Sequence, residues 1–391
     1  MAVWKECAIG DLCSTISDTY KRNDDYVVLI ITSDVLEGKV LNHTVVENKN
    51  LKGQFKKTFK RNDILYSEIR PANKRFAFVD FDDTSNYIAS TKLMVIRHNE
   101  KVLPEFLYAV LKSESVIKEL QQLAETRSGT FPQITFSSEL APMKIKLPDK
   151  VTQKKIVDVL SCIENKIENN LRINNNLEQQ ARAIYQNMFE NIDSLPAGWH
   201  KVPLGEVINI SNKSFNPLKE PETLLEHYSI PAYDDAKFPV FELSTEIKSN
   251  KFIIDDSCFM ISKLNPTTKR VWRPYCLTNN AVCSTEFIVY KAKEESLTDY
   301  LYSVINSDSF SEFMCSHVTG STGSRQRTTP KDTLFFEVLV PTEEELEVFQ
   351  TTVAPMYAQM RNIAIENNKL KETRDALLPR LMSGEIDVSN V

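Results

Sequence analysis

Two stretches of this 391-residue sequence carry the same alternating pattern, one near its middle and one near its C-terminus. Mostly apolar residues recur at spacings of three and four over residues 156–188 and again over residues 349–381. That spacing is typical of the seam along which two helices pack in a coiled coil. The seam positions are Ile156, Leu160, Ile163, Ile167, Asn174, Leu177 and Ile184 in the first stretch, and Val353, Met356, Met360, Ile363, Asn367, Leu370 and Leu377 in the second. Because the two stretches lie 193 residues apart, the pattern predicts a chain built twice from one unit.

The repeat extends into the segments that precede each helix. Residues 64–71 parallel 258–266, and residues 90–96 parallel 284–290, at offsets that drift only slightly along the chain. A period near 194 residues is far longer than the repeats of solenoid proteins, so it indicates two tandem domains. Each copy combines short runs rich in β-branched and aromatic residues with one following helix, expected at 104–122 and at 297–314. Strands grouped before a helix predict an α+β fold in both domains.

Helix signals set the expected boundaries. Thr342 followed by Glu345 fits a capping box at the start of the second long helix, and residues 195–198 read Leu-Pro-Ala-Gly, which ends the first. Each helix then has roughly 40 residues and a length of about 55–60 Å. The expected order is a first domain over 1–150, a long helix over 151–192, a second domain over 193–341, a second long helix over 342–384 and a short tail over 385–391.

An amphipathic helix of this length needs a partner, and the simplest partner is the other copy. Duplicated units usually pair with two-fold symmetry, which predicts an antiparallel coiled coil that separates two domains related by a pseudo-two-fold axis. Asn174 and Asn367 occupy matching positions near the middle of the two helices. A buried asparagine in a seam lowers stability but fixes register, so we expect these two residues to meet near the axis. The alternative is that both lie in a splayed, solvated stretch.

Basic and aromatic residues cluster at matching places in the two domains. Residues 49–75 carry nine cations against two acids, and residues 262–275 carry four cations and no acid. Clustered cations neutralise phosphates, while arginine and amide side chains can read base edges. A charge run is more often a solvated face, but the shared position around Pro71 and Pro266 favours a DNA-binding surface. The candidate DNA-binding residues are Lys56, Lys57, Lys60, Arg61, Arg70, Lys74, Arg75, Arg127 and Gln133 in the first domain, and Lys263, Lys269, Arg270, Arg273, Arg325, Gln326 and Arg327 in the second.

Motifs for catalysis are missing or weak. The sequence has no phosphate-binding P-loop and no adenine-methyltransferase N-P-P-[YF] motif, and its five histidines show no metal-ligand spacing. Asp234 or Asp235 with Glu246 and Lys248 faintly resembles a nuclease core, but such spacing arises often by chance. The seven scattered cysteines predict reduced thiols in a cytoplasmic protein. We expect no membrane-spanning segment, no signal peptide, no metal site and no catalytic residues, and the net charge of −6 argues only weakly against nucleic acid.

Four local stretches resemble one protein family. They are Ile145–Pro148 leading into Gln153–Val157, Ile173–Leu177 followed by Ala183–Tyr185, Leu195–Trp199, and the C-terminal Leu377–Ile386. With the tandem domains and long helices, they are similar to the specificity (S) subunits of type I restriction-modification systems. The likeness covers the whole chain and is strongest in the helices. The entry to the first helix departs from the family pattern, because Gln153 alone represents the usual Glu-Gln pair.

The resemblance implies a non-catalytic reader of double-stranded DNA. Each target-recognition domain would bind one half of a split, asymmetric site, and the helices would fix the spacer between the halves. The helices would also dock two methyltransferase (M) subunits, which use S-adenosylmethionine to methylate adenine, and restriction (R) subunits would add ATP- and Mg-dependent translocation and cleavage. The polar outer face of the first helix suits such docking, or is merely solvated; it comprises Glu164, Asn165, Glu168, Gln179 and Gln180. Two rivals remain, namely a self-contained DNA-modifying enzyme and a coiled-coil adaptor that does not bind DNA.

Overall fold

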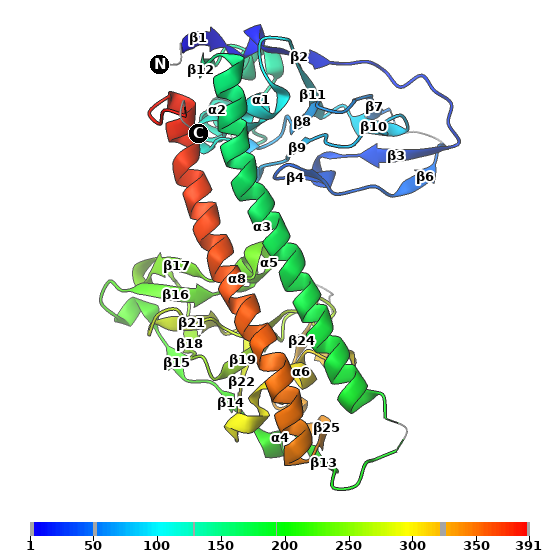
Figure 1. The fold of residues 1–391 in the computed structure, drawn as a ribbon, viewed down its shortest axis with the longest axis vertical. Helices are drawn as coiled ribbons and strands as arrows, with labels where there is room; N and C mark the ends of the chain where they lie inside the picture. Colours follow the sequence, from blue (N-terminus) through cyan, green and yellow to red (C-terminus); the bar gives the residue numbers. More distant parts are fainter. Residues whose placement is uncertain (1–3, 50–52, 128–129, 193, 321–325, 389–391) are drawn as a thin grey trace. The chain divides into compact units, whose positions relative to one another are not determined.

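The computed structural model describes residues 4–49, 53–127, 130–192, 194–320 and 326–388. The chain forms two compact units, and Figure 1 traces both in sequence colours. Unit 1 comprises Met1–Lys166 and Leu370–Val391, and unit 2 comprises Ile167–Lys369. The two longest helices, α3 (Lys150–Tyr185) and α8 (Glu343–Ser383), each contribute one part to unit 1 and the other part to unit 2. Each unit therefore contains one α+β domain together with a segment of both long helices.

Unit 1 contains two four-stranded sheets among its described residues. One sheet has the order β2-β11-β8-β9, formed by Cys13–Ile16, Leu93–His98, Ile64–Ser67 and Phe76–Phe78. The other has the order β6-β3-β10-β7, formed by Val45–Glu47, Tyr26–Ile30, Tyr87–Ser90 and Phe55–Lys57. Two further pairs join β1 (Lys5–Ala8) to β12 (Lys144–Leu147) and β4 (Val35–Leu36) to β5 (Lys39–Val40).

Unit 2 repeats this arrangement. Its first sheet has the order β14-β22-β19-β20, formed by Ile208–Ser211, Phe287–Ala292, Cys258–Ser262 and Val271–Trp272. Its second has the order β15-β18-β21-β16-β17, formed by Ser214–Phe215, Lys251–Ile253, Ala281–Ser284, Leu224–Tyr228 and Val240–Leu243. Two short pairs join β13 (His200–Pro203) to β25 (Glu337–Val340) and β23 (Val318–Thr319) to β24 (Arg327–Thr328). Each unit also places one parallel pair in its second sheet, β3 with β10 and β16 with β21. The α+β class and the internal repeat predicted from the sequence are thus confirmed.

The alternation of side chains along β11 explains the layering of unit 1. Met94 and Ile96 enter a core shared with the helices, whereas Leu93 and Val95 enter a second core shared with the other sheet. Because successive strand residues point to opposite faces, a continuous apolar run such as Leu-Met-Val-Ile fills both cores. Residues 287–290 of β22 divide in the same way between two cores of unit 2.

The helix expected at 104–122 is two helices, α1 (Pro104–Leu111) and α2 (Glu114–Arg127). Likewise, the helix expected at 297–314 is α6 (Thr298–Ile305) followed by α7 (Asp308–Ser316). Both predictions of a single helix are therefore wrong. Each break falls at a serine: the Ser113 hydroxyl donates to the Val110 carbonyl at 2.7 Å, and the Ser307 hydroxyl accepts the Phe310 amide at 3.1 Å. Such local bonds compete with the helical ladder and favour a helix terminus.

The long helices run antiparallel within each unit. In unit 1, Ile156 and Leu160 near the start of α3 share a core with Leu378 and Leu381 near the end of α8. In unit 2, the reverse ends meet, and the buried residues there are Ala181, Tyr185, Phe189, Leu346, Phe349 and Val353. Beyond Tyr185 the helix continues as a π-helical segment, Gln186–Glu190. The capping box of α8 is confirmed, because the Thr342 amide donates to the Glu345 carboxylate at 3.1 Å and the Glu345 amide donates to the Thr342 hydroxyl at 3.4 Å.

Seam residues differ in their exposure. Those that are buried are Ile156, Leu160, Ile167, Val353, Ile363 and Asn367. Those that are half-buried are Ile163, Asn174, Leu177, Ile184, Met356, Met360, Leu370 and Leu377. The buried aromatic residues Tyr185 and Phe189 were not among the predicted seam positions. They follow Ala181 at spacings of four, so the apolar stripe shifts across the helix toward the second domain's core.

The asparagines in the seam do not pair as expected. The Asn170 side chain donates to the Asn367 oxygen at 2.9 Å and to the Glu366 carboxylate at 2.7 Å. Asn174 instead donates to the Met360 carbonyl at 3.3 Å. The prediction that Asn174 meets Asn367 is therefore wrong.

Antiparallel register explains this outcome. The repeat mate of Asn170 is Ile363, and the repeat mate of Asn367 is Asn174. In a symmetric helix pair, the counterpart of the 170–367 contact is a contact between positions 174 and 363. Isoleucine offers no amide there, and the Asn174 side-chain oxygen is buried with no hydrogen-bond partner among the described residues.

Candidate nucleic-acid interface

A strained turn follows the same strand in both units. Arg70 has a φ of 45° before Pro71, and Asn265 has a φ of 48° before Pro266. Left-handed backbone is uncommon for residues other than glycine, and a following proline restricts the residue further. Strain of this kind persists only where the surrounding structure fixes it, and it often marks a functional site. We call these segments, 67–71 and 262–266, the proline turns.

A serine hydroxyl supports each proline turn. The Ile69 amide donates to the Ser67 hydroxyl at 3.0 Å, and the Leu264 amide donates to the Ser262 hydroxyl at 3.2 Å. The Ser67 hydroxyl also donates to the Ile69 carbonyl at 3.2 Å, and the Ser262 hydroxyl donates to the Leu264 carbonyl at 3.0 Å. The two turns are therefore built from the same local bonds.

In both units a second loop lies against the proline turn, and it carries the predicted residue Gln133 in unit 1 and the predicted residues Gln326 and Arg327 in unit 2. The Arg70 amide donates to the Pro132 carbonyl at 3.1 Å, and the Asn265 amide donates to the Gln326 carbonyl at 3.0 Å. Isolated bridges also join Ile69 to Gln133 and Leu264 to Arg327. Within each unit, the structure therefore places a predicted residue of the second loop, Gln133 or Arg327, next to the cation-rich segment.

Some candidate residues have side chains that form no hydrogen bond or ion pair with the described part of the chain. Lys56, Lys60 and Arg70 are exposed, and Lys263 is half-buried. Their charges are available to a phosphate without the loss of an internal ion pair. They are the cations that fit a DNA backbone best.

The other candidates of unit 1 have partners inside the unit. Two of them bind backbone carbonyls: Lys57 donates to Thr91 at 3.0 Å and to Leu93 at 2.8 Å, and Arg75 donates to Ser33 at 3.0 Å. Burial lowers the pKa of Lys57. The remaining pairs join Arg61 to Asp82 at 2.8 Å, Lys74 to Glu114 at 2.7 Å, Arg127 to Glu139 at 3.2 Å and Gln133 to Lys92 at 3.3 Å.

In unit 2 the predicted cations other than Lys263 and Arg325 also have partners inside the unit. Arg270 holds Asp234 through two bonds of 2.6 and 2.8 Å, Arg273 contacts Asp299, and Arg327 contacts Glu286 at 3.0 and 3.2 Å. Gln326 contributes its backbone carbonyl, as described above, and Arg325 lies outside the described residues. Arg–carboxylate pairs of this kind fix the plane of the guanidinium group, which can prepare it for a directed contact.

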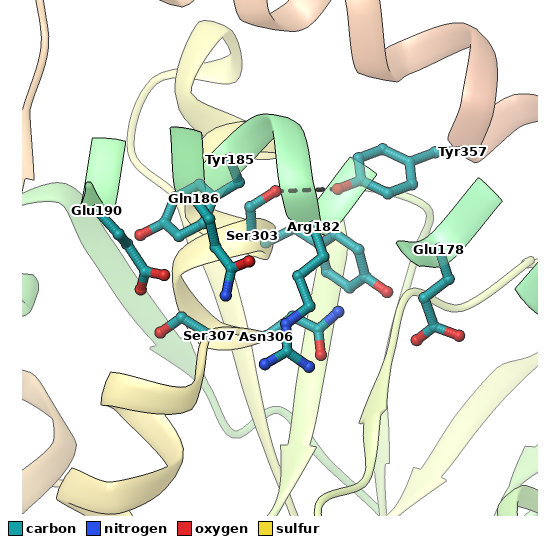
Figure 2. A pocket seen from close by; sticks show the side chains of 10 residues that line it. Glu178, Arg182, Tyr185, Gln186, Glu190, Ser303, Asn306, Ser307 and Tyr357 are labelled. Atoms are coloured by element: carbon teal, nitrogen blue, oxygen red, sulfur yellow. Dashed lines mark hydrogen bonds between the residues drawn. The ribbon is translucent and has the colours of Figure 1, made fainter. Parts of the chain in front are cut away.

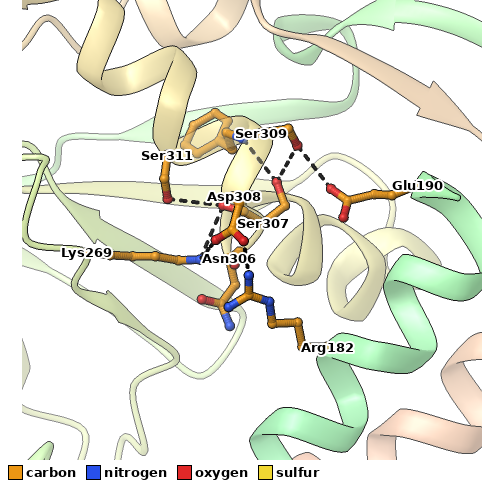
Figure 3. Close-up of polar contacts among 9 residues, drawn as sticks. Arg182, Glu190, Lys269, Asn306, Ser307, Asp308, Ser309 and Ser311 are labelled. Carbon is orange, nitrogen blue, oxygen red and sulfur yellow. Dashed lines mark hydrogen bonds and ion pairs between the residues drawn. The ribbon is translucent and has the colours of Figure 1, made fainter.

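Lys269, which follows the second proline turn in sequence, belongs to a polar network that reaches α3 (Figure 3). Its ammonium group donates to the carbonyls of Asn306 and Ser307 and lies 3.5 Å from Asp308 at the start of α7. Asp308 also pairs with Arg182 of α3. Burial lowers the pKa of Lys269, although Asp308 acts in the opposite direction. We call Lys269, Asp308 and Arg182 the anchor network of unit 2.

Unit 1 has a related network at the matching positions. Lys74 pairs with Glu114 at the start of α2, and the nearby Asp375 of α8 adds to the field around it. Glu114, followed by Glu37 and Asp375, raises the pKa of Lys74. The sequence analysis missed Glu114, Asp308, Arg182 and Asp375, although the repeat offset would have identified them as mates.

A small polar pocket lies beside the anchor network of unit 2, where α3, α6 and α8 meet (Figure 2). Arg182 lines it from α3 and Gln186 from the π-helical segment that follows, and Ser303 bonds to the Tyr357 hydroxyl at 2.9 Å across it. Burial raises the pKa of Tyr357 to about 12, so this phenol stays protonated and serves as a hydrogen-bonding group. The pocket is therefore part of the packing between the long helices and the domain core.

Two of the residues that resemble a nuclease core, Asp234 and Glu246, form hydrogen bonds within their own domain. Asp234 is held by Arg270, and Glu246 accepts the Leu243 amide at 3.2 Å. Within the described ranges, no three metal-ligating side chains of His, Cys, Asp or Glu come together. In the same part of the chain, no helix combines the length and the apolarity needed to span a bilayer.

Comparisons with known proteins agree with this geometry. Residues 1–179 match the family model described as type I restriction modification DNA specificity domain. The type I restriction enzyme HindI specificity subunit of Haemophilus influenzae is 31% identical over 462 residues, covering 99% of this chain and 100% of that protein. The MjaIX specificity subunit of Methanocaldococcus jannaschii is 23% identical, covering 74% of this chain and 71% of that protein.

Two solved structures share the fold. The S subunit of a type I restriction-modification system from M. genitalium has a TM-score of 0.54 at 15% identity, with 97% of this chain and 96% of that chain covered. A chain from a structure described as the basis of complex assembly and conformational transition of the type I R-M system has a TM-score of 0.50 at 19% identity, with 98% of each chain covered. With the full-length relative above, these findings show that the chain belongs to the family of DNA specificity subunits of type I restriction-modification systems.

Proposed function

We propose that each unit of this specificity subunit reads one half of a split, asymmetric DNA target. Members of the family recognise DNA and do not catalyse, so function here rests on which surface contacts the DNA. The observation that supports the proposal is the duplicated proline turn, with a second loop bonded to it and a cation that forms no ion pair among the described residues, Arg70 or Lys263, within it in each unit. One surface would meet one half-site, and its repeat mate would meet the other.

The cations would divide into two roles. Lys56, Lys60, Arg70 and Lys263 would contact phosphates, since they have no internal partner to give up among the described residues. Arginine and amide groups held by neighbours would contact base edges. Phosphate contacts fix position and contribute salt dependence, whereas base contacts carry sequence information.

The long helices would act as a spacer. α3 is an α-helix of 36 residues and α8 is one of 41 residues. At 1.5 Å per residue, α3 is about 54 Å long. A rigid element of this kind would favour one separation between the two half-sites.

The chain would act in the cytoplasm within a larger assembly. Two methyltransferase subunits would supply S-adenosylmethionine-dependent adenine methylation, and restriction subunits would supply ATP and Mg chemistry. The outer face of α3 would dock these subunits, and several of its polar residues are exposed, including Asn165, Gln179 and Gln180. Glu164 is less suited, because it pairs with Lys112 inside unit 1.

Salt-dependent DNA binding by the full chain with its methyltransferase partner tests the proposal. Arg70→Ala and Lys263→Ala should each weaken binding and reduce the slope of log affinity against log salt by about 1. Lys5→Ala is a matched control, since Lys5 is an exposed lysine of β1 outside the candidate surface. Equal effects from all three variants would contradict the assigned surface.

The same experiment separates the rivals. An adaptor without DNA-binding activity would show no salt-dependent affinity for any duplex. A self-contained enzyme would methylate or cut DNA as a purified chain without partners. A single contiguous recognition sequence, found by methylation of a randomised library, would contradict the split-target proposal.

A further inference from the structure

Three chain segments meet at one backbone junction beside each proline turn. In unit 1, the Glu68 amide donates to the Lys92 carbonyl at 3.0 Å, and the Ile134 amide donates to the Glu68 carbonyl at 2.9 Å. In unit 2, the Lys263 amide donates to the Glu286 carbonyl at 2.9 Å, and the Thr328 amide donates to the Lys263 carbonyl at 3.1 Å. The two junctions therefore have the same backbone frame, one repeat apart.

The side chains on this frame differ in charge. Glu68 in unit 1 corresponds to Lys263 in unit 2, and Lys92 corresponds to Glu286, so acid and base have changed places. Gln133 and Arg327 occupy the third position, because they bridge to the matching turn residues Ile69 and Leu264. We call these three positions the junction cluster.

The junction cluster is partly open to solvent in both units. Side-chain exposure is 49% for Lys92 and 22% for Glu68 in unit 1, and 42% for Arg327 and 30% for Glu286 in unit 2. Groups in this range can reach an external partner while they remain oriented by their neighbours.

Each cluster orients one group that suits a base edge. In unit 1, Lys92 donates to the Gln133 side-chain oxygen at 3.3 Å, which sets the direction of the amide. In unit 2, Glu286 accepts from Nε and Nη2 of Arg327, which sets the plane of the guanidinium group. Glutamine pairs with adenine through two bonds, and arginine pairs with guanine through two bonds in the major groove.

We propose that the junction cluster determines base specificity, with Arg327 reading a guanine in one half-site and Gln133 reading an adenine in the other. This inference rests on the proposed function, since it names the groups that read bases on the proposed surface. A shared frame with different side chains is what two modules need in order to read different sequences in the same pose. A purely structural pair at these exposures would contribute little to stability, and its loss would not alter base preference.

Reciprocal substitutions test the proposal. Arg327→Gln and Gln133→Arg are made separately in the full chain, which is assembled with its methyltransferase partner and given a library of DNA with both half-sites randomised. Each variant should change the preferred base at one or two adjacent positions in one half-site only. The loss of preference for the original base should be about 5- to 100-fold, the range expected for one bidentate base contact.

Glu286→Gln is the second variant for unit 2, because it keeps Arg327 and loosens its orientation. It should lower discrimination at the same base position as Arg327→Gln without creating a new preference. Thermal unfolding and retention of the methyltransferase partner show whether each variant is folded.

Two results would overturn the inference while the split-target function stands. One is an unchanged motif with uniformly weaker methylation, which indicates phosphate contacts. The other is a changed preference in both half-sites from one substitution, which indicates an indirect effect. A wild-type motif that is not split would instead refute the proposed function, so the two failures are distinguishable.

Discussion

Replacement of the buried asparagines in the helix pair gives a direct test of what holds α3 and α8 in register. The perturbation is Asn170→Leu, Asn367→Leu and the two together. Asn170 is 1% exposed and Asn367 is 6% exposed, and the first donates to the second at 2.9 Å. Both residues lie in unit 2, so the effect should appear in the unfolding of that unit.

The expected magnitudes follow from the bonds that each change removes. Asn170→Leu leaves the Asn367 oxygen buried without this donor, which should cost about 1–3 kcal/mol. Asn367→Leu should cost somewhat less, because Asn170 keeps its bond to Glu366 at 2.7 Å. The double variant replaces both partners by apolar groups, so it should be nearly neutral or stabilising. The coupling energy between the two positions should then be close to the sum of the two single costs.

Urea unfolding of the full chain, followed by circular dichroism, provides the free energies for the double-mutant cycle. Asn362→Leu is the matched control, since Asn362 is an exposed asparagine of α8, the helix that also contains Asn367. The control should change the free energy of unfolding by less than about 0.5 kcal/mol. Single costs that simply add in the double variant would refute the pairing. If the double variant still required one length of DNA between the two half-sites, the asparagine pair would not set the register of α3 against α8.

Three further predictions concern the anchor network, pH and helix length. Asp308→Asn should weaken DNA binding through unit 2 by several fold in a filter-binding assay. It should lower the free energy of unfolding by less than about 1 kcal/mol, because the ion pairs of Asp308 with Arg182 and Lys269 are partly exposed. Burial, opposed by Glu242, lowers the pKa of His227, so folded unit 2 binds fewer protons than the unfolded chain. The stability of unit 2 should therefore be intact above about pH 6.5 and fall as the pH drops below that value. His227→Gln should flatten this pH dependence in thermal unfolding at about pH 7.5 and about pH 5.0. Four residues inserted between Asn170 and Leu177 lengthen α3 by about 6 Å, so the preferred spacer in a methylation assay should change, and methylation at the original spacer would refute the spacer model.

The repeat and the fold class could be predicted from the sequence because they depend on local patterns. Strand runs such as residues 93–96 fill two cores through simple alternation, and the capping box at Thr342 is a local motif. The two turns of the candidate surface could also be located from the sequence. Pro71 and Pro266 mark matching turns, and in both the residue before the proline has a left-handed backbone.

The partners of individual side chains could not be predicted, because they come from distant parts of the chain. Arg270 meets Asp234 and Arg273 meets Asp299, although nothing near either arginine in sequence indicates an acid. The pairing of Asn367 with Asn170 depends on the antiparallel register, which repeat alignment alone does not supply. The helix breaks at Ser113 and Ser307 depend on side-chain bonds that compete with a ladder of similar energy.

The duplication supplies an internal comparison between scaffold and specificity. Ser67 and Ser262, whose hydroxyls accept backbone amides in the proline turns, occupy matching positions in the two copies and are both serine. Residues of the junction cluster change their type on an unchanged frame. At these positions the serine is kept where its hydroxyl bonds to the backbone, and the side chains that are partly open to solvent have changed.

The anchor networks show a third behaviour. In unit 1, the cation Lys74 is flanked by Glu114 and Asp375, whereas in unit 2 the anion Asp308 is flanked by Lys269 and Arg182. The charge on the long helix has reversed between the copies, yet each network still alternates in sign. A charge network between the segment after each proline turn and a long helix is therefore kept, with Lys74 near Asp375 in unit 1 and Asp308 bridging Lys269 and Arg182 in unit 2. A reader whose two halves must recognise different sequences at one spacing needs both properties, free variation at the reading surface and compensated variation where that surface joins the spacer.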